Sequence, residues 1–221
     1  MRFLGRKIAW SLCALAAPVT AGLTLGRLGA VFGAALAVIA SLWLWLWLPR
    51  MAHAAFEAGR FTPAVRWYRV LHASATSAAR ERCSLLSRVG CLVASNRHTD
   101  AETLLRTVDL ATLDAAGRAV WLNNRACALI DRDPQAALGL VDEATALRPD
   151  VPALQHTRGM ALLAVGRIDD AIATLDGMRG GGELAPRLEA ERCRDLARAW
   201  AQKGEAAYAE DYRMRAEALA R

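Results

Sequence analysis

The hydrophobic and polar residues of the chain follow two different patterns, and the change comes near its fiftieth residue. Residues 8–25 form one run without a charged side chain and residues 28–48 form a second, with Gly26 and Arg27 between them. At about 1.5 Å per residue the second run is roughly 31 Å long, enough to cross a bilayer core of about 30 Å. The pattern predicts two membrane helices, about 8–25 and 28–48, so that residues 1–49 form a membrane hairpin with a tight turn.

After this region, apolar residues recur at the spacing of amphipathic helices, with short polar turns between them. The stretch 150–178 predicts two short helices joined by a turn at Gly166. Gly159 and Ala171 are expected to be small because the two helices approach each other closely at these positions. The rest of the chain is therefore predicted to be all-α.

The helix pair recurs along residues 50–221. An alanine early in each second helix marks the recurrence, at spacings of 37, 36, 34 and 38 residues: Ala64, Ala101, Ala137, Ala171 and Ala209. A glycine or asparagine stands five residues before four of them: Gly59, Asn96, Gly166 and Gly204. The glycines at 180–182 are expected in a turn between repeats. Because one pair cannot bury its apolar face alone, the pattern predicts about five stacked pairs.

In these features residues 50–221 resemble the tetratricopeptide-repeat (TPR) family. The resemblance is strongest over 118–178, where the stretch from Trp121 to Ala126 is similar to the family's first helix. It implies an α-solenoid whose inner surface is formed by the first helix of each pair. Arg213 stands where the family usually has an apolar residue, as suits a terminal repeat whose outer face meets water. The predicted fold is a two-helix membrane hairpin followed by this solenoid.

The resemblance also implies a groove that binds a protein or peptide. The inner-face candidates are Leu86, Val93, Asn123, Asn124, His156, Met160, Leu163, Arg194 and Arg198. Asn124 is the best single candidate, because its amide can pair with a ligand's backbone and resembles an asparagine of the family members that clamp chaperone C-terminal carboxylates. The lysines of that clamp are absent. The alternative for the apolar candidates is packing against neighbouring helices.

Charge predicts the orientation of the hairpin. The formal net charge of +6 comes mostly from the front of the chain, where the four basic residues are Arg2, Arg6, Lys7 and Arg27. Three of these precede the first run and Arg50 and Arg60 follow the second, so the positive-inside rule places both termini in the cytoplasm. We expect an integral protein of a bacterial inner membrane with a cytoplasmic repeat domain. The alternative for residues 8–25 is a cleaved signal peptide.

Two further features of the second run bear on the membrane. Three tryptophans alternate with leucines at its end: Trp43, Trp45 and Trp47. Indole rings favour the headgroup zone, so these residues are expected at the cytoplasmic membrane interface. A row of small residues precedes them: Gly29, Gly33 and Ala37. Such rows let membrane helices approach closely, either within the hairpin or, as a second possibility, in a homodimer.

The sequence contains no pattern that predicts catalysis. Its five cysteines form no CxxC pair, and its four histidines form no HxxxH or HExxH spacing. Residues 50–221 are nearly neutral, which argues against a nucleic-acid partner. We expect no enzyme, cofactor or metal. The leading hypothesis is a membrane-anchored TPR scaffold or adaptor that binds a protein or peptide. The alternatives are a self-assembling subunit of a membrane complex and an accessory factor of an envelope or haem-synthesis pathway.

Overall fold

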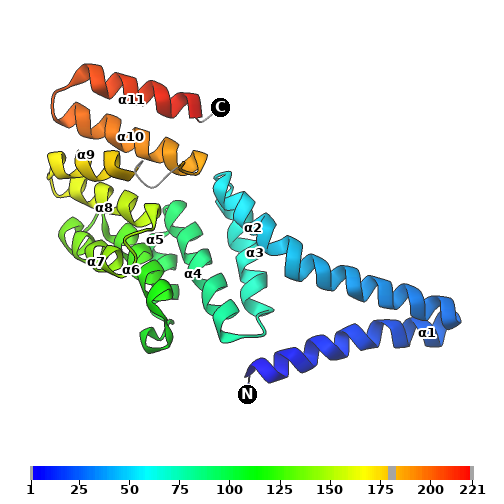
Figure 1. Cartoon of the computed structure of the whole chain (residues 1–221). Helices are drawn as coiled ribbons and strands as arrows, with labels where there is room; N and C mark the ends of the chain where they lie inside the picture. Colours follow the sequence, from blue (N-terminus) through cyan, green and yellow to red (C-terminus); the bar gives the residue numbers. More distant parts are fainter. Residues whose placement is uncertain (1, 179–182, 220–221) are drawn as a thin grey trace. The chain divides into compact units, whose positions relative to one another are not determined.

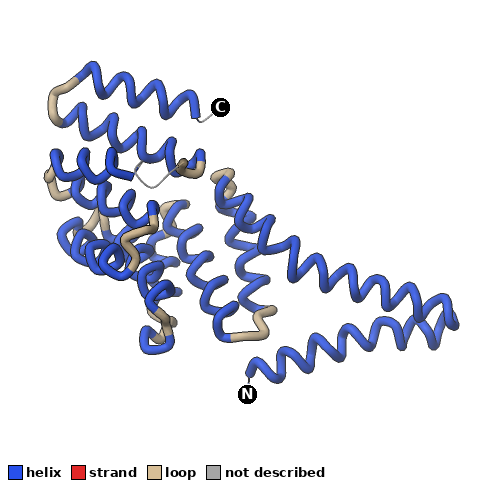
Figure 2. Tube along the Cα trace, viewed as in Figure 1, coloured by secondary structure: helices blue, strands red, loops and turns tan. Residues whose placement is uncertain are grey.

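The computed structural model describes residues 2–178 and 183–219, and its regular structure in these ranges is helical (Figure 2). Some predictions concern parts of the chain outside the description: the side chains of Arg2, Arg6, Lys7 and Cys13 and the glycines at 180–182. The chain forms two compact units, residues 1–95 and residues 96–221, and each is described by itself. The predicted boundary at residue 49 stays a prediction.

The first unit begins with a long helical element rather than two separate helices. This element, α1, runs from Arg2 to Leu42 and has one non-helical residue, Gly26, with φ 67° and ψ −156°. The chain bends sharply at this kink (Figure 1). A Cβ added to Gly29 would lie only 2.1 Å from the carbonyl oxygen of Ala21, so the residues on either side of the kink are in tight contact. The predicted bounds of 8–25 and 28–48 are therefore wrong, because helical backbone continues on both sides of Gly26.

The structure also replaces the two predicted membrane crossings with one candidate. Within the described residues, a single helical stretch, Pro18–Glu57, is long and apolar enough to cross a membrane. Only 17% of its most apolar window is buried in the protein. A signal sequence near the N-terminus would meet the same criteria.

Three helices follow in the first unit after a π-helical turn, η1, at Trp43–Trp47. They are α2 (Leu48–Glu57), α3 (Phe61–Ala73) and α4 (Ala78–Ala94). Each packs against the next along the chain, and Ala55, Ala64 and Cys91 meet in a small core. Ser77 begins α4 as an N-cap whose side chain accepts a hydrogen bond from the backbone N–H of Arg80 at 3.3 Å.

In its described residues, 96–178 and 183–219, the second unit has seven α-helices and a short 3₁₀ turn, η2 (Leu110–Thr112). The helices are α5 (His98–Leu105), α6 (Ala115–Leu129), α7 (Pro134–Leu147), α8 (Pro152–Ala164), α9 (Ile168–Gly177), α10 (Pro186–Gln202) and α11 (Ala206–Leu219). Each packs against its successor, and a continuous apolar core extends from α6 to α10. The all-α, TPR-like fold is confirmed within each unit: the described helices α2 to α4, and α5 to α11, pack in sequence. The number of five pairs stays a prediction, because α4 and α5 belong to different units.

Three of the turns between paired helices contain the same left-handed glycine. Gly59, Gly166 and Gly204 have φ values of 69°, 79° and 84°. The glycine N–H bonds to the carbonyl three residues earlier, and the next N–H bonds to the carbonyl five residues earlier. This Schellman pattern ends a helix and turns the chain back on itself. Asn96 has the corresponding position after α4, with φ 57°, and asparagine tolerates this conformation better than most residues.

The alanine that follows each turn is the fourth residue of the second helix in every pair. Its N–H bonds to the carbonyl of the residue just before the helix, at 3.0 to 3.3 Å. Four of these alanines are fully buried: Ala64, Ala101, Ala137 and Ala171. The fifth, Ala209, is half-buried in the last pair. The regular spacing of the alanines thus corresponds to the same helix position, with the same backbone hydrogen bond, five times along the chain.

Gly159 is confirmed as a point of close helix approach. A Cβ added there would lie 2.6 Å from Cγ and Cδ2 of Leu175, a fully buried side chain that would have to shift. Gly139, in the adjacent pair, also lies within a helix but has no atom within 4 Å of its added Cβ. The two glycines therefore form a matched comparison.

We predict that Gly159→Ala destabilises the protein by about 1–3 kcal/mol, because the new methyl group overpacks the contact with Leu175. Gly139→Ala should stabilise the protein by about 0.5–1 kcal/mol, because alanine restricts the unfolded chain and suits an open helix position. The measurement is the free energy of unfolding in urea for both variants. Equal effects of the two substitutions would contradict a close approach at Gly159.

A candidate protein-binding face

The first helices of three successive pairs, α6, α8 and α10, are neighbours in the second unit. Polar contacts connect them across the face. Cys127 Sγ on α6 lies 3.4 Å from Thr157 Oγ1 on α8. His156 Nε2 on α8 lies 2.9 Å from Asp195 Oδ2 on α10, and both side chains are buried. These contacts fix the spacing of the three helices, so their accessible side chains form one defined surface, here called the inner face.

On α6 the accessible amide of the inner face belongs to Asn123. Val120, Asn123 and Cys127 follow one another at helical spacing, and Val120 is 43% exposed. The Oδ1 atom of Asn123 is buried and has no hydrogen-bond partner within the described residues. Asn124 is one residue on, about 100° around the helix, and is itself buried. The structure thus brings Asn123 to the face and packs Asn124 inside the unit.

The candidates on α8 and α10 differ in exposure. His156 and Leu163 are buried, and Met160 is half-buried. Arg194 and Arg198 are exposed on α10. Beside them Arg187 and Glu191 form an ion pair at 2.6 Å. The inner face therefore has a half-buried thioether, a half-buried amide side chain and exposed guanidinium groups.

The remaining candidates lie on α4, in the first unit. Leu86 is buried and Val93 is half-buried. Leu86 therefore packs inside its unit, as the alternative interpretation of the apolar candidates expects.

Sequence reasoning missed a buried arginine beside the inner face. Arg192 on α10 is 1% exposed and donates two hydrogen bonds of 2.7 Å to the carboxylate of Glu189. A further Nη1 contact reaches the carbonyl of Leu175 on α9 at 3.3 Å. The hydrogen bonds that Arg192 donates to Glu189 raise the pKa of Arg192 above its ordinary value. The i, i+3 spacing of Glu189 and Arg192 was the available signal, but this spacing is also common on exposed helix faces.

The three tryptophans do not have the same environment. Trp43 and Trp47 are exposed, 46% and 61%, and their place at a membrane interface stays a prediction. Trp45 instead packs against the first unit, with the Arg80 guanidinium 4.3 Å above its ring. It forms one wall of an apolar pocket of about 240 Å³, where burial raises the pKa of Tyr68 to about 12. Ligand pockets are usually larger, about 300–1,000 Å³, so we interpret this one as a packing gap.

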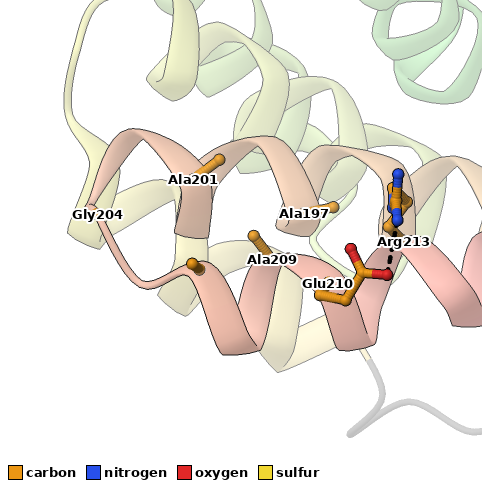
Figure 3. A pocket seen from close by; sticks show the side chains of 7 residues that line it. Ala197, Ala201, Gly204, Ala209, Glu210 and Arg213 are labelled. Atoms are coloured by element: carbon orange, nitrogen blue, oxygen red, sulfur yellow. Dashed lines mark hydrogen bonds and ion pairs between the residues drawn. The ribbon is translucent and has the colours of Figure 1, made fainter.

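A larger hollow, of about 500 Å³, lies on the last helix pair of the second unit. Ala197 and Ala201 of α10 and Ala209 of α11 line it, with the ion pair between Glu210 and Arg213 at its edge (Figure 3). The corresponding positions 38 residues earlier include Ile172 and Leu175, which are buried under α10. The hollow therefore corresponds to a surface that α10 covers in the preceding pair, with Glu210 and Arg213 in place of the apolar Ile172 and Leu175.

Comparison with known proteins identifies no family by sequence. No protein-family model and no curated protein match the chain. Among solved structures, it is similar to "Crystal structure of MamA", with 20% identity, a TM-score of 0.46, and coverage of 76% of this chain and 93% of that one. It is also similar to "MamA MSR-1 C2", with 18% identity, a TM-score of 0.45, and coverage of 79% and 95%. The repeat assignment rests on the turns and small residues of the chain itself.

We predict that His156→Ala destabilises the protein by roughly 1–3 kcal/mol, because it leaves the buried carboxylate of Asp195 without its imidazole partner. Arg194→Ala, on the exposed side of α10, should change stability by less than about 0.5 kcal/mol. Urea unfolding of both variants provides the measurement. Two small effects would show that His156 does not hold α8 and α10 together.

We also predict that Glu210→Ile combined with Arg213→Leu makes the protein self-associate. These changes restore the apolar surface that earlier repeats cover with the next helix, so a second copy gains an apolar surface to pack against. Light scattering of the detergent-purified chain should then show a higher mass that rises with concentration. Asp211→Ile with Arg215→Leu removes another exposed ion pair of α11 and serves as the control. Self-association of both variants would contradict the assignment of the hollow.

Proposed function

We propose that this protein is a membrane-anchored TPR scaffold whose inner face binds a segment of a partner protein. The observation that carries the proposal is the buried Oδ1 of Asn123, which has no hydrogen-bond partner among the described residues. A buried polar atom of this kind costs free energy unless something satisfies it. After a rotation of the Asn123 side chain that exposes this oxygen, a backbone N–H of a bound segment would do so.

The neighbouring side chains indicate the chemistry of the segment. Met160 offers a flexible, polarisable contact for an apolar side chain. Arg194 and Arg198 present guanidinium groups, which favour carboxylates. Asp195 lies 3.5 Å from Arg198 and offsets part of its charge, which leaves Arg194 as the stronger anion contact. The face thus suits an extended or helical segment with an apolar residue followed by an acidic one.

We assign the membrane anchor to the candidate span, Pro18–Glu57. Its exposed leucines and valines need an apolar environment. With a single crossing, three basic residues before the span (Arg2, Arg6, Lys7) oppose Arg50 and Arg60 after its apolar part, so the positive-inside rule alone does not set the orientation. The cytoplasmic side for the following helices is part of the proposal. The membrane in this proposal is a bacterial inner membrane. Tethering raises the effective concentration of the inner face near membrane-bound partners.

A site-specific photo-crosslinker tests the proposed face in membranes of the native host. We predict that p-benzoylphenylalanine at Met160 gives a discrete adduct with a protein other than the chain itself. Adding Asn123→Ala or Arg194→Glu should reduce the adduct several-fold, because each removes one proposed contact. Immunoblotting of irradiated membranes provides the measurement.

The control places the same crosslinker at Ala173, an exposed position on the second helix α9. That position should give no discrete adduct. Equal adducts at both positions, or no effect of Asn123→Ala and Arg194→Glu, would exclude the inner face as the binding site. An adduct containing only the chain itself would favour a self-assembling subunit.

A further inference from the structure

The first unit carries an unusual excess of positive charge outside α1. Residues 50–95 contain seven arginines and two acidic residues, whereas residues 96–221 contain more acidic than basic residues. The nearly neutral net charge of residues 50–221 is therefore the sum of a positive and a negative part. The positive part belongs to residues 50–95, at the end of the candidate membrane span and directly after it.

The arginines of the two units also differ in their partners. In the second unit most exposed arginines form ion pairs, for example Arg97 with Asp100 and Arg167 with Asp170, each at 2.6 Å. In the first unit Arg60, Arg66 and Arg69 are exposed, and no described acidic side chain lies within ion-pair distance of any of them. Their charge is therefore available to an external anion.

Arg66 and Arg69 lie on one face of α3. The exposed positions of this helix are Thr62, Arg66, Arg69, Val70 and Ala73, which recur at helical spacing opposite the buried Ala64. Arg60 immediately precedes α3. We call these exposed positions, together with Arg60, the basic face. Val70 is 44% exposed, so the face combines cationic groups with an apolar side chain.

We propose that the basic face of α3 binds the anionic phospholipid headgroups of the membrane that α1 enters. The proposal extends the anchoring described under the proposed function. Arginine suits this partner because its planar guanidinium group can form paired hydrogen bonds with a phosphate. Clusters of basic residues next to a membrane segment are attracted to anionic lipid. Only three residues separate the end of the candidate span, Glu57, from the start of α3 at Phe61.

A nucleic acid is the other polyanion that unpaired arginines could bind. The lipid surface is favoured because the basic face follows the apolar span so closely along the chain. The exposed apolar residues Trp47 and Met51, 61% and 37% exposed, also lie in the segment leading to it. Such residues suit the interfacial zone of a bilayer.

The experiment places the full-length chain in vesicles and measures how close α3 lies to the headgroups. Cys13 and Cys83 are replaced by serine, and a fluorophore is attached to Ala73→Cys on the basic face. The vesicles contain phosphatidylcholine alone or with 30% phosphatidylglycerol, plus a lipid with a headgroup quencher. We expect at least twofold stronger quenching with phosphatidylglycerol, with the difference lost in 0.5 M salt because exposed charges are then screened.

Arg66→Gln with Arg69→Gln should reduce the quenching to the level found in phosphatidylcholine. The control, Arg97→Gln with Arg167→Gln, removes the same charge from the second unit and should leave quenching unchanged. Equal quenching in both lipids, or equal loss in both double variants, would overturn the proposal. Arginine-dependent binding of a DNA duplex without a difference between the vesicles would also overturn it.

A carbonate wash followed by flotation separates failure of this proposal from failure of the anchor. If the chain stays with both kinds of vesicle but shows no lipid-dependent quenching, the result supports the anchor and excludes the headgroup contact. If carbonate removes the chain, although the chain binds phosphatidylglycerol through Arg66 and Arg69 before the wash, the result excludes the anchor and supports the headgroup contact. Absence of binding to either vesicle overturns both.

Discussion

The structure depends on bringing two short helices into close contact immediately after a tight turn. A left-handed residue ends the first helix, and the fourth residue of the next helix must then be small enough to lie against its partner. Ala64, Ala137 and Ala171 meet this condition with no exposed surface. Short helices are marginal alone in water, so burial across these contacts, rather than helix propensity, holds each pair together. The same condition explains Gly159, which receives Leu175 where any side chain would collide.

Contacts between pairs add polar groups to the apolar core that they share, and these polar groups determine which residues remain available. The buried pair of His156 and Asp195 and the enclosed Arg192 use polar groups to fix α10 against the helices before it. Each of these groups finds its partners within the second unit. The amide oxygen of Asn123 has no partner among the described residues, and the proposed binding of a partner segment is built on this difference.

The repeat architecture could be predicted from sequence because it depends on residue size at fixed spacing. Alanines near 34 residues apart and glycines five residues before them are visible without a structure. The accessible side of each helix was harder to predict, since Asn123 and Asn124 differ by one position and point about 100° apart. Trp45 could not be separated from Trp43 and Trp47 either, because its packing depends on Arg80, 35 residues later. The sequence does not show that helical backbone continues on both sides of Gly26, because a glycine beside a charged residue also occurs in ordinary turns.

The distribution of arginine partners links the fold to its surroundings. In the second unit most exposed basic residues form an ion pair with an acidic one. Surface pairs of this kind add little stability, but they offset the charge of the arginines. Arg194, on the inner face, is exposed. In the first unit Arg66 and Arg69 have no such acid within the described residues. An arginine without a partner on a helix surface contributes little to folding, so folding alone does not account for a cluster of them. The proposed contact with anionic headgroups would account for both their position and the absence of compensating acids among the described residues.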